Sequence, residues 1–100
     1  MIKPFTLDTL RRDYRDRILA IAEKQGVDNV RVFGSYARGD QTEDSDIDFL
    51  FTCRPGTDLM DLGGLLWRLE ELLGKKVDIA TDGGLSPHLK DRILEEATPL

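Results

Sequence analysis

Residues 46–53 constrain the fold more than any other part of the chain. Every second residue from Ile47 to Phe51 is apolar, and the acids Asp46 and Asp48 occupy positions between them. Side chains alternate across a β-strand, so this pattern predicts a strand with one buried apolar face and two carboxylates on the other. Their α-carbons would lie roughly 6.6 Å apart. Two acids at that spacing repel each other unless a cation binds there, so the pattern predicts a cation site.

Two further strands and three helices are predicted around this segment. Hydrophobic periodicity, helix caps and glycine stops place helices at 7–25, 58–73 and from Ser86 onward, and further strands at 29–33 and 76–81. The order is α-β-β-α-β-α. This order indicates an α/β (α+β) fold, with a small mixed sheet of three or more strands and helices on one face. The expectation is a single domain covering residues 1–100.

Composition excludes several classes of protein. The chain has 100 residues, of which 40% are hydrophobic and 33% charged, as in ordinary globular proteins. A net charge of −5 disfavours direct binding to a nucleic-acid backbone. No segment approaches the roughly 18 apolar residues that span a membrane, and residues 1–5 do not resemble a signal peptide. Cys53 is the only cysteine. Together these features predict a cytoplasmic protein without membrane contact.

A third acid follows the same pattern as the first two. In the strand predicted at 76–81, Val77 and Ile79 face one way and Asp78 the other. If this strand lies beside residues 46–53, Asp78 joins Asp46 and Asp48 on one face. Carboxylates are ligands for hard cations such as Mg²⁺, and paired ions roughly 4 Å apart serve phosphoryl transfer. A random Asp-x-Asp pair is more often a solvated strand face, but the third acid favours a metal site.

The residues after the first predicted strand suggest a phosphate site. The strand at 29–33 runs into Gly34 and Ser35, and a short helix is expected to start there. Glycine lets a ligand approach the backbone closely, and a helix start presents N–H groups to an anion. Arg38 is a candidate second contact. A phosphate site followed by an acidic pair on the next strand predicts nucleotide chemistry.

This combination resembles a known family. The segments Phe33-Gly34-Ser35-Tyr36-Ala37-Arg38-Gly39 and Ser45-Asp46-Ile47-Asp48-Phe49-Leu50, with Val77-Asp78 later, are similar to the minimal nucleotidyltransferases (MNT) of the DNA polymerase β-like superfamily. The resemblance implies that Gly34 and Ser35 hold the outer phosphates of ATP. It also implies that Asp46 and Asp48 bind Mg²⁺, as two ions, and that Asp78 helps bind metal and activates the attacking hydroxyl. Many members carry Arg where this chain has Tyr36, which leaves Arg38 as the available basic phosphate contact.

The same resemblance implies a protein partner. Small members are often antitoxins paired with a HEPN-domain ribonuclease toxin, and some transfer AMP from ATP to a tyrosine of that toxin. A chain of 100 residues has no room for a further acceptor domain, so another protein or a second copy must support the acceptor. The alternative is a non-catalytic antitoxin that neutralises its partner by binding. The presence of all three acids favours the enzyme.

The helix predicted at 58–73 carries a possible partner surface. Its leucines form one stripe, whereas Met60 and Trp67 lie together on the far side. Gly63 and Gly64 lie between them, although each disfavours a helix interior by roughly 1 kcal/mol relative to Ala. One interpretation is an interface with the toxin or a second copy, since Trp and Met are enriched in interface cores. The other is burial of this side within the domain itself.

Overall fold

Residues 5–100 are described by the computed structural model, in which a four-stranded sheet is flanked by helices. The strands are β1 (Val27–Phe33), β2 (Ile47–Cys53), β3 (Val77–Thr81) and β4 (Thr98–Pro99). The helical segments are α1 (Leu7–Thr9), the π-helical η1 (Leu10–Tyr14), α2 (Arg15–Lys24), α3 (Gly34–Arg38), α4 (Leu59–Leu73), the 3₁₀ turn η2 (Asp82–Gly84) and α5 (Pro87–Glu96).

The sheet is mixed, with strand order β3-β2-β1-β4. Strand β1 is antiparallel to both β2 and β4, whereas β2 and β3 run parallel. A parallel pair needs a crossover connection, and α4 supplies it between β2 and β3. The predicted fold class is therefore confirmed. The fourth strand was not predicted individually, because two residues are too few to show a periodicity.

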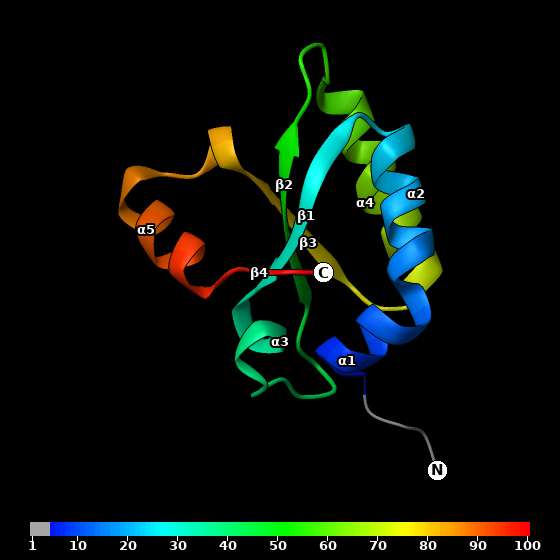
Figure 1. Ribbon diagram of the computed structural model, residues 1–100, viewed down its shortest axis with the longest axis vertical. Coiled ribbons are helices and arrows are strands. Elements are labelled where there is room, and N and C mark those ends of the chain that lie inside the picture. The colour runs from blue at the N-terminus through cyan, green and yellow to red at the C-terminus, as the bar shows by residue number, and fades with distance from the viewer. Residues whose placement is uncertain (1–4) are drawn as a thin grey trace.

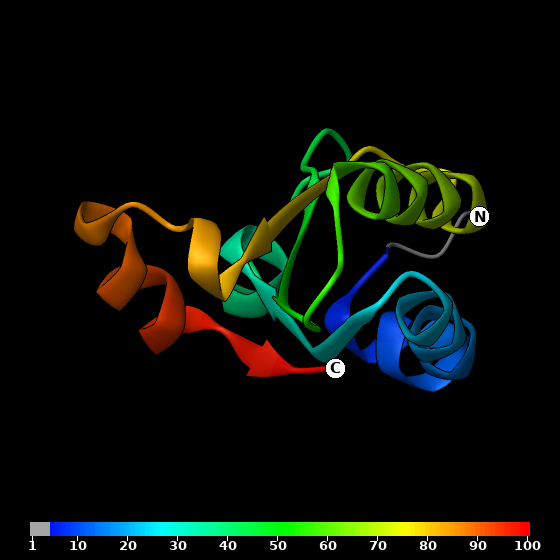
Figure 2. The same ribbon diagram turned by 90° about the horizontal axis from the view of Figure 1, so that it is seen from above.

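One face of the sheet holds the core beneath α2 and α4. These two helices lie side by side over the strands, whereas α5 lies on the other side, so the expectation of helices on one face holds for α2 and α4 but not for α5 (Figures 1 and 2). Ile47, Phe49 and Phe51 of β2 share this face and are completely buried in the core with residues of α2 and α4, as the alternation predicts. The buried core includes Ile18, Ala22, Val32, Ile47, Phe49, Phe51, Leu65, Leu69 and Leu73.

Local sequence explains the limits of α4. Asp58 is its N-cap and forms a capping box with Asp61, in which each side chain accepts a hydrogen bond from the other residue's backbone N–H. Gly74 ends the helix in the left-handed conformation, with φ of 64°. The predicted helix at 58–73 is thus confirmed within one residue.

The helix predicted at 7–25 is interrupted. A π-helical segment, η1, separates α1 from α2, and Tyr14 at the junction has φ of −123° and ψ of −10°. The wider turn carries Tyr14 to Phe5, on which its ring stacks with centroids 5.5 Å apart. The hydrophobic spacing in this region is close enough to 3.6 residues that the sequence alone does not show the wider turn.

Strand β1 starts two residues before the predicted segment at 29–33. Val27 already pairs with Cys53, and the register shifts between Asp28 and Arg31. Asn29 lies within this irregularity with φ of 53°, a conformation that Asn tolerates better than most residues. The bulge breaks the alternation from which the strand start was predicted. Within residues 5–100, no helix is long and apolar enough to cross a membrane.

Candidate active site

The sheet topology brings the predicted acids to one end of three strands. Asp48, near the start of β2, lies opposite Phe33 at the end of β1 and opposite Asp78 on β3. Asp46 directly precedes β2. The expectation that the strand of Asp78 lies beside that of Asp48 is therefore confirmed, because these two residues occupy the same register position of a parallel pair.

Gly34 lies directly against the carboxylate of Asp48. It follows β1 as the first residue of α3, with φ of 72°. A Cβ at this position would collide with the Asp48 carboxylate. Both the backbone conformation and the close approach therefore require glycine. Ser35 follows in the first turn of α3 and is half-buried, and its carbonyl accepts hydrogen bonds from the N–H groups of Gly39 and Asp40.

The acids influence each other strongly. The pKa of Asp48 is raised to about 6, first by burial, then by the charges of Asp78 and Asp46 and by a hydrogen bond with the Asp78 carboxyl group. Within residues 5–100, none of the three acids forms an ion pair with Lys or Arg. The electrostatics are those of a site in which a cation would be strongly favoured.

The donor set suits a hard divalent cation. All the converging side chains are carboxylates, which Mg²⁺ and Ca²⁺ prefer to sulfur or imidazole ligands. Asp48 and Asp78 meet directly, while Asp46 acts on Asp48 through its charge. In the described part of the chain, no three Asp, Glu, His or Cys side chains already converge tightly enough to hold an ion. Asp46 would therefore have to turn toward the pair, which a residue outside the strand can do.

A fourth carboxylate, that of Glu96, meets the predicted phosphate site. Glu96 is the last residue of α5, and its Oε2 accepts a hydrogen bond of 3.0 Å from the Gly34 N–H. Its other oxygen forms an ion pair with Arg38, which also pairs with Asp40 at 3.2 Å. Glu96 thus links Arg38 to Gly34. No role for this acid was predicted from the sequence.

The sequence contains one signal that could have indicated Glu96. Helix α5 ends on two acids, Glu95 and Glu96, with no basic residue in its last turn. Carboxylates at a helix C-terminus are unfavourable because they face the negative end of the helix dipole. An acid in that position therefore suggests a partner elsewhere in the fold. The partner itself is 62 residues away in sequence, at Gly34.

Tyr36 belongs to the core rather than to the site. Its side chain is only 2% exposed and packs among the buried residues beneath the helices. The residue that departs from the family pattern therefore fills the interior next to α3. The basic group nearest to Gly34 in this helix is that of Arg38.

Met60 and Trp67 are on the surface of α4. Their side chains are 85% and 62% exposed, so the interpretation that they are buried within the domain is wrong. Gly63 has open space where a Cβ would project, but a Cβ on Gly64 would collide with the side chain of Gln25. Gly64 is thus explained by its contact with the side chain of Gln25, which directly follows α2, whereas Gly63 leaves open space between Met60 and Trp67.

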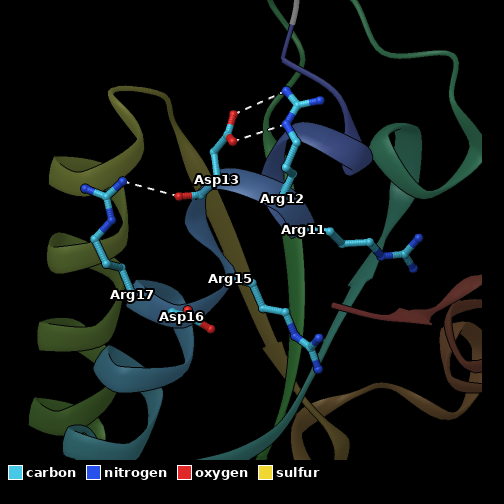
Figure 3. A pocket seen from close by; sticks show the side chains of 6 residues that line it. All are labelled: Arg11, Arg12, Asp13, Arg15, Asp16 and Arg17. Carbon is cyan, nitrogen blue, oxygen red and sulfur yellow. Dashed lines mark hydrogen bonds and ion pairs between the residues drawn. The ribbon is translucent and has the colours of Figure 1, made fainter.

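A hollow lies on helical segments other than those that carry the predicted acids. It has a volume of about 440 Å³ and is lined by charged residues of η1 and α2, namely Arg11, Arg12, Asp13, Arg15, Asp16 and Arg17. Figure 3 shows that Arg12 and Arg17 both bond to Asp13, while Arg11 and Arg15 point the other way. Arg11 donates to the Pro99 carbonyl, so part of this charge fastens the C-terminal strand.

Comparison with known proteins places this geometry in a family. The model of the nucleotidyltransferase domain matches residues 15–100. The candidate protein adenylyltransferase MJ0435 of Methanocaldococcus jannaschii is 48% identical over 85 residues, which are 85% of this chain and 91% of that protein. A solved structure of a candidate minimal nucleotidyltransferase superposes with a TM-score of 0.86 at 43% identity, covering 99% of this chain and 100% of that one.

A more distant structure shares the fold alone. It is a chain of the complex between tri-AMPylated Shewanella oneidensis HEPN toxin and MNT antitoxin, with a TM-score of 0.64 and 19% identity. The alignment covers 84% of this chain and 66% of that one. The family match over residues 15–100 includes the glycine and the acids at one end of the sheet. The chain belongs to the minimal nucleotidyltransferases of the nucleotidyltransferase domain family.

Proposed function

We propose that this nucleotidyltransferase transfers AMP from ATP, with Mg²⁺, to a tyrosine hydroxyl of a partner HEPN-domain toxin and thereby acts as its antitoxin. The observation that carries the proposal is the position of Asp48, which faces Asp78 in register and touches Gly34 while lacking a cationic partner in the described residues. Support for adenylyl transfer comes from the relative in Methanocaldococcus jannaschii. Support for the partner comes from the fold shared with the toxin complex.

Gly34, Ser35 and Arg38 are the proposed phosphate contacts. The backbone N–H of Gly34 donates to a carboxylate oxygen of Glu96 in this structure, so its direction suits an anionic oxygen. Arg38 is on the last turn of the same short helix and its guanidinium already reaches an acid bonded to Gly34. Both donors therefore point to the same position, and this arrangement suits an anion with several oxygens.

Asp46, Asp48 and Asp78 are the proposed ligands of Mg²⁺, as two ions. When bound, the metal supplies positive charge that offsets the triphosphate and the charge that develops during transfer. Burial and the neighbouring carboxylates raise the pKa of Asp48, and a bound cation would offset this shift. Removing any of the three carboxylates should therefore weaken metal binding.

Asp78 is also the proposed proton acceptor. The acceptor hydroxyl loses its proton to the Asp78 carboxylate as its oxygen forms a bond to the α-phosphorus of ATP. The bond from that phosphorus to the bridging oxygen of the β-phosphate breaks, and pyrophosphate leaves with the electron pair. Asp78 suits this role because it is the exposed acid of the pair, whereas Asp48 is half-buried.

The partner is proposed to bind at least partly through α4. Met60, Trp67 and Leu59 are large apolar side chains exposed on this helix, at 85%, 62% and 85%. Aromatic and methionine side chains are typical of interface cores. A second copy of the chain could use the same surface, so both a homo-oligomer and a hetero-oligomer are testable.

A labelling experiment tests the proposal. The chain is incubated with the HEPN toxin, Mg²⁺ and ATP labelled at the α-phosphate, and we expect label to remain on the toxin after denaturation. The Asp46→Asn, Asp48→Asn double variant and a sample with EDTA should leave the toxin unlabelled. If the double variant transfers AMP like the wild type, the assignment of the acids is wrong. If it neutralises the toxin without any labelling, the protein is the non-catalytic binding antitoxin instead.

A further inference from the structure

The carboxylate of Glu96 occupies the donors that the proposed function assigns to ATP. Its Oε2 accepts the Gly34 N–H bond at 3.0 Å, and its Oε1 accepts from the Arg38 guanidinium. These are the backbone donor and the cation proposed as phosphate contacts. A negatively charged oxygen pair thus already lies where the phosphate oxygens would have to bind.

Glu96 is held as an anion in a site rich in other anions. The ion pair with Arg38 lowers the pKa of Glu96, burial partly opposes this, and the bond from Gly34 lowers it further. Its charge in turn contributes to the raised pKa of Asp48. One arginine therefore serves both Glu96 and Asp40 beside three further acids. A bound triphosphate with its metal would need Arg38 and would repel Glu96.

The packing of α5 allows Glu96 to leave. No residue of α5 is buried, and the side chain of Glu96 itself is 18% exposed. The chain after α5 is fastened independently, since Arg11 donates to the Pro99 carbonyl at 2.6 Å and Leu100 donates to the Val30 carbonyl at 3.1 Å. Rotation of the Glu96 side chain, with a small shift of the last turn of α5, would vacate the site without disturbing the core.

We propose that Glu96 is an intramolecular competitor of the nucleotide, whose carboxylate holds Gly34 and Arg38 in the free protein and must leave when ATP binds. The inference rests on the proposed function, because it assumes that these donors bind phosphate. Binding would then be weakened by the fraction of molecules in which the site is free. It would also couple the nucleotide state to the last turn of α5. An alternative is that Glu96 is a positioning residue, which orients Arg38 and Gly34 and so strengthens binding.

The sign of one mutational effect separates these roles. Glu96→Gln keeps an acceptor for the Gly34 N–H but removes the charge that holds Arg38. Isothermal titration of the full chain with Mg²⁺-ATP, and separately with tripolyphosphate, should show binding tightened about three- to tenfold. The matched control is Glu95→Gln, which removes an equal charge from the neighbouring exposed residue and should change affinity less than about twofold.

A second measurement needs no mutation. Hydrogen exchange of the wild-type chain should become faster in residues 93–97 when tripolyphosphate is added, because the last turn of α5 loses its contact with α3. Unchanged exchange on saturation, or binding by Glu96→Gln that is as weak as or weaker than that of the wild type, would overturn the competitor role alone. If neither chain binds Mg²⁺-ATP or tripolyphosphate, the phosphate site is wrongly assigned and the proposed function fails with it.

Discussion

Two clusters of charged side chains lie on the same face of the sheet and are built in opposite ways. At one end, Asp82 accepts two hydrogen bonds from Arg31, at 2.9 and 3.1 Å, and a third from the hydroxyl of Thr52. At the other end, Asp48 meets Asp78, and no Lys or Arg of the described chain pairs with either acid. Along β2, only three residues lie between Asp48 and Thr52.

The pKa values of the two aspartates diverge accordingly. Burial raises the pKa of Asp82, but the hydrogen bonds from Thr52 and Arg31 outweigh it, so the net pKa is lowered. Burial also raises the pKa of Asp48, and there the neighbouring carboxylates raise it further, to about 6. The comparison teaches that a buried acid stabilises a fold when the fold provides its cation. When the fold provides none, the acid is available to bind a cation from solution.

The largest expected effect is a difference in AMP transfer when the same Asp→Asn substitution is made in each of the two clusters. Asp48→Asn should reduce AMP transfer at least about 100-fold, because a charge that holds the metal is lost. Asp82→Asn should leave transfer within about threefold of the wild type, since the bonds that Asp82 forms within residues 5–100 are to Arg31 and Thr52, away from the acids. Initial rates with saturating Mg²⁺-ATP and toxin measure both. Comparable losses in the two variants would remove the functional distinction between the clusters.

Asp78→Asn tests whether Asp78 serves mainly as proton acceptor or mainly as metal ligand. If Asp78 accepts the proton of the attacking hydroxyl, kcat should fall about 100-fold while the Kd of Mg²⁺-ATP changes less than about fivefold. Single-turnover rates and calorimetric binding give the two numbers separately. Equal losses in rate and affinity would make Asp78 mainly a metal ligand, as Asp48 is proposed to be.

The cluster in which Arg31 pairs with Asp82 should contribute more to the stability of the fold than the cluster around Asp48. Arg31→Ala removes the bonds to Asp82 and Thr52 and leaves a partly buried carboxylate without its cation. We expect a loss of about 2 kcal/mol in the free energy of unfolding. For a chain of this size that corresponds to a Tm lower by about 10 °C. Thermal melts followed by circular dichroism measure it, and Arg31→Lys is the control that keeps the charge but loses the two-point bond.

Because Asp48 lacks a cationic partner in the described chain, the metal-free protein should become less stable as the pH rises. The folded-state pKa of Asp48 is about 6 and its reference value is 3.8, so the folded chain holds this proton more tightly than the unfolded chain. The stabilising contribution is complete below about pH 4 and is lost as pH rises through about 6. Allowing for solvent screening of this half-exposed group, the change is about 1 kcal/mol.

Asp48→Asn tests this pH dependence, because it removes the titrating group. The variant should be more stable than the wild type at pH 7 without metal and nearly equal at pH 4. Asp82 has the opposite sign, since its lowered pKa gives stability that is lost as pH falls. Denaturant unfolding in EDTA at several pH values measures both. A wild type that gains stability between pH 4 and 7 relative to Asp48→Asn would contradict the assignment.

Alternation along β2 and β3 was enough to predict which acids share a face, and the structure confirms that Asp48 and Asp78 are neighbours. The leucine stripe and the Gly74 stop were enough to predict α4, because both are local signals. The start of β1 and the contact of Glu96 could not be predicted. A bulge at Asn29 interrupts the periodicity, and the Glu96 contact joins residues whose meeting depends on the whole chain path.

The smallest expected effect on the isolated chain concerns a surface that belongs to neither cluster. Trp67 is 62% exposed on α4, so Trp67→Glu should change the free energy of unfolding by no more than about 0.5 kcal/mol. If α4 binds the partner, the same change places a charge in an apolar contact and should weaken association at least tenfold. Size-exclusion chromatography with light scattering, alone and with the HEPN toxin, distinguishes a second copy from the toxin. Leu94→Glu is the matched control, because Leu94 is 41% exposed on α5, across the sheet from α4. Equal weakening by both variants would place the partner elsewhere, and unfolding of Trp67→Glu would contradict its surface position.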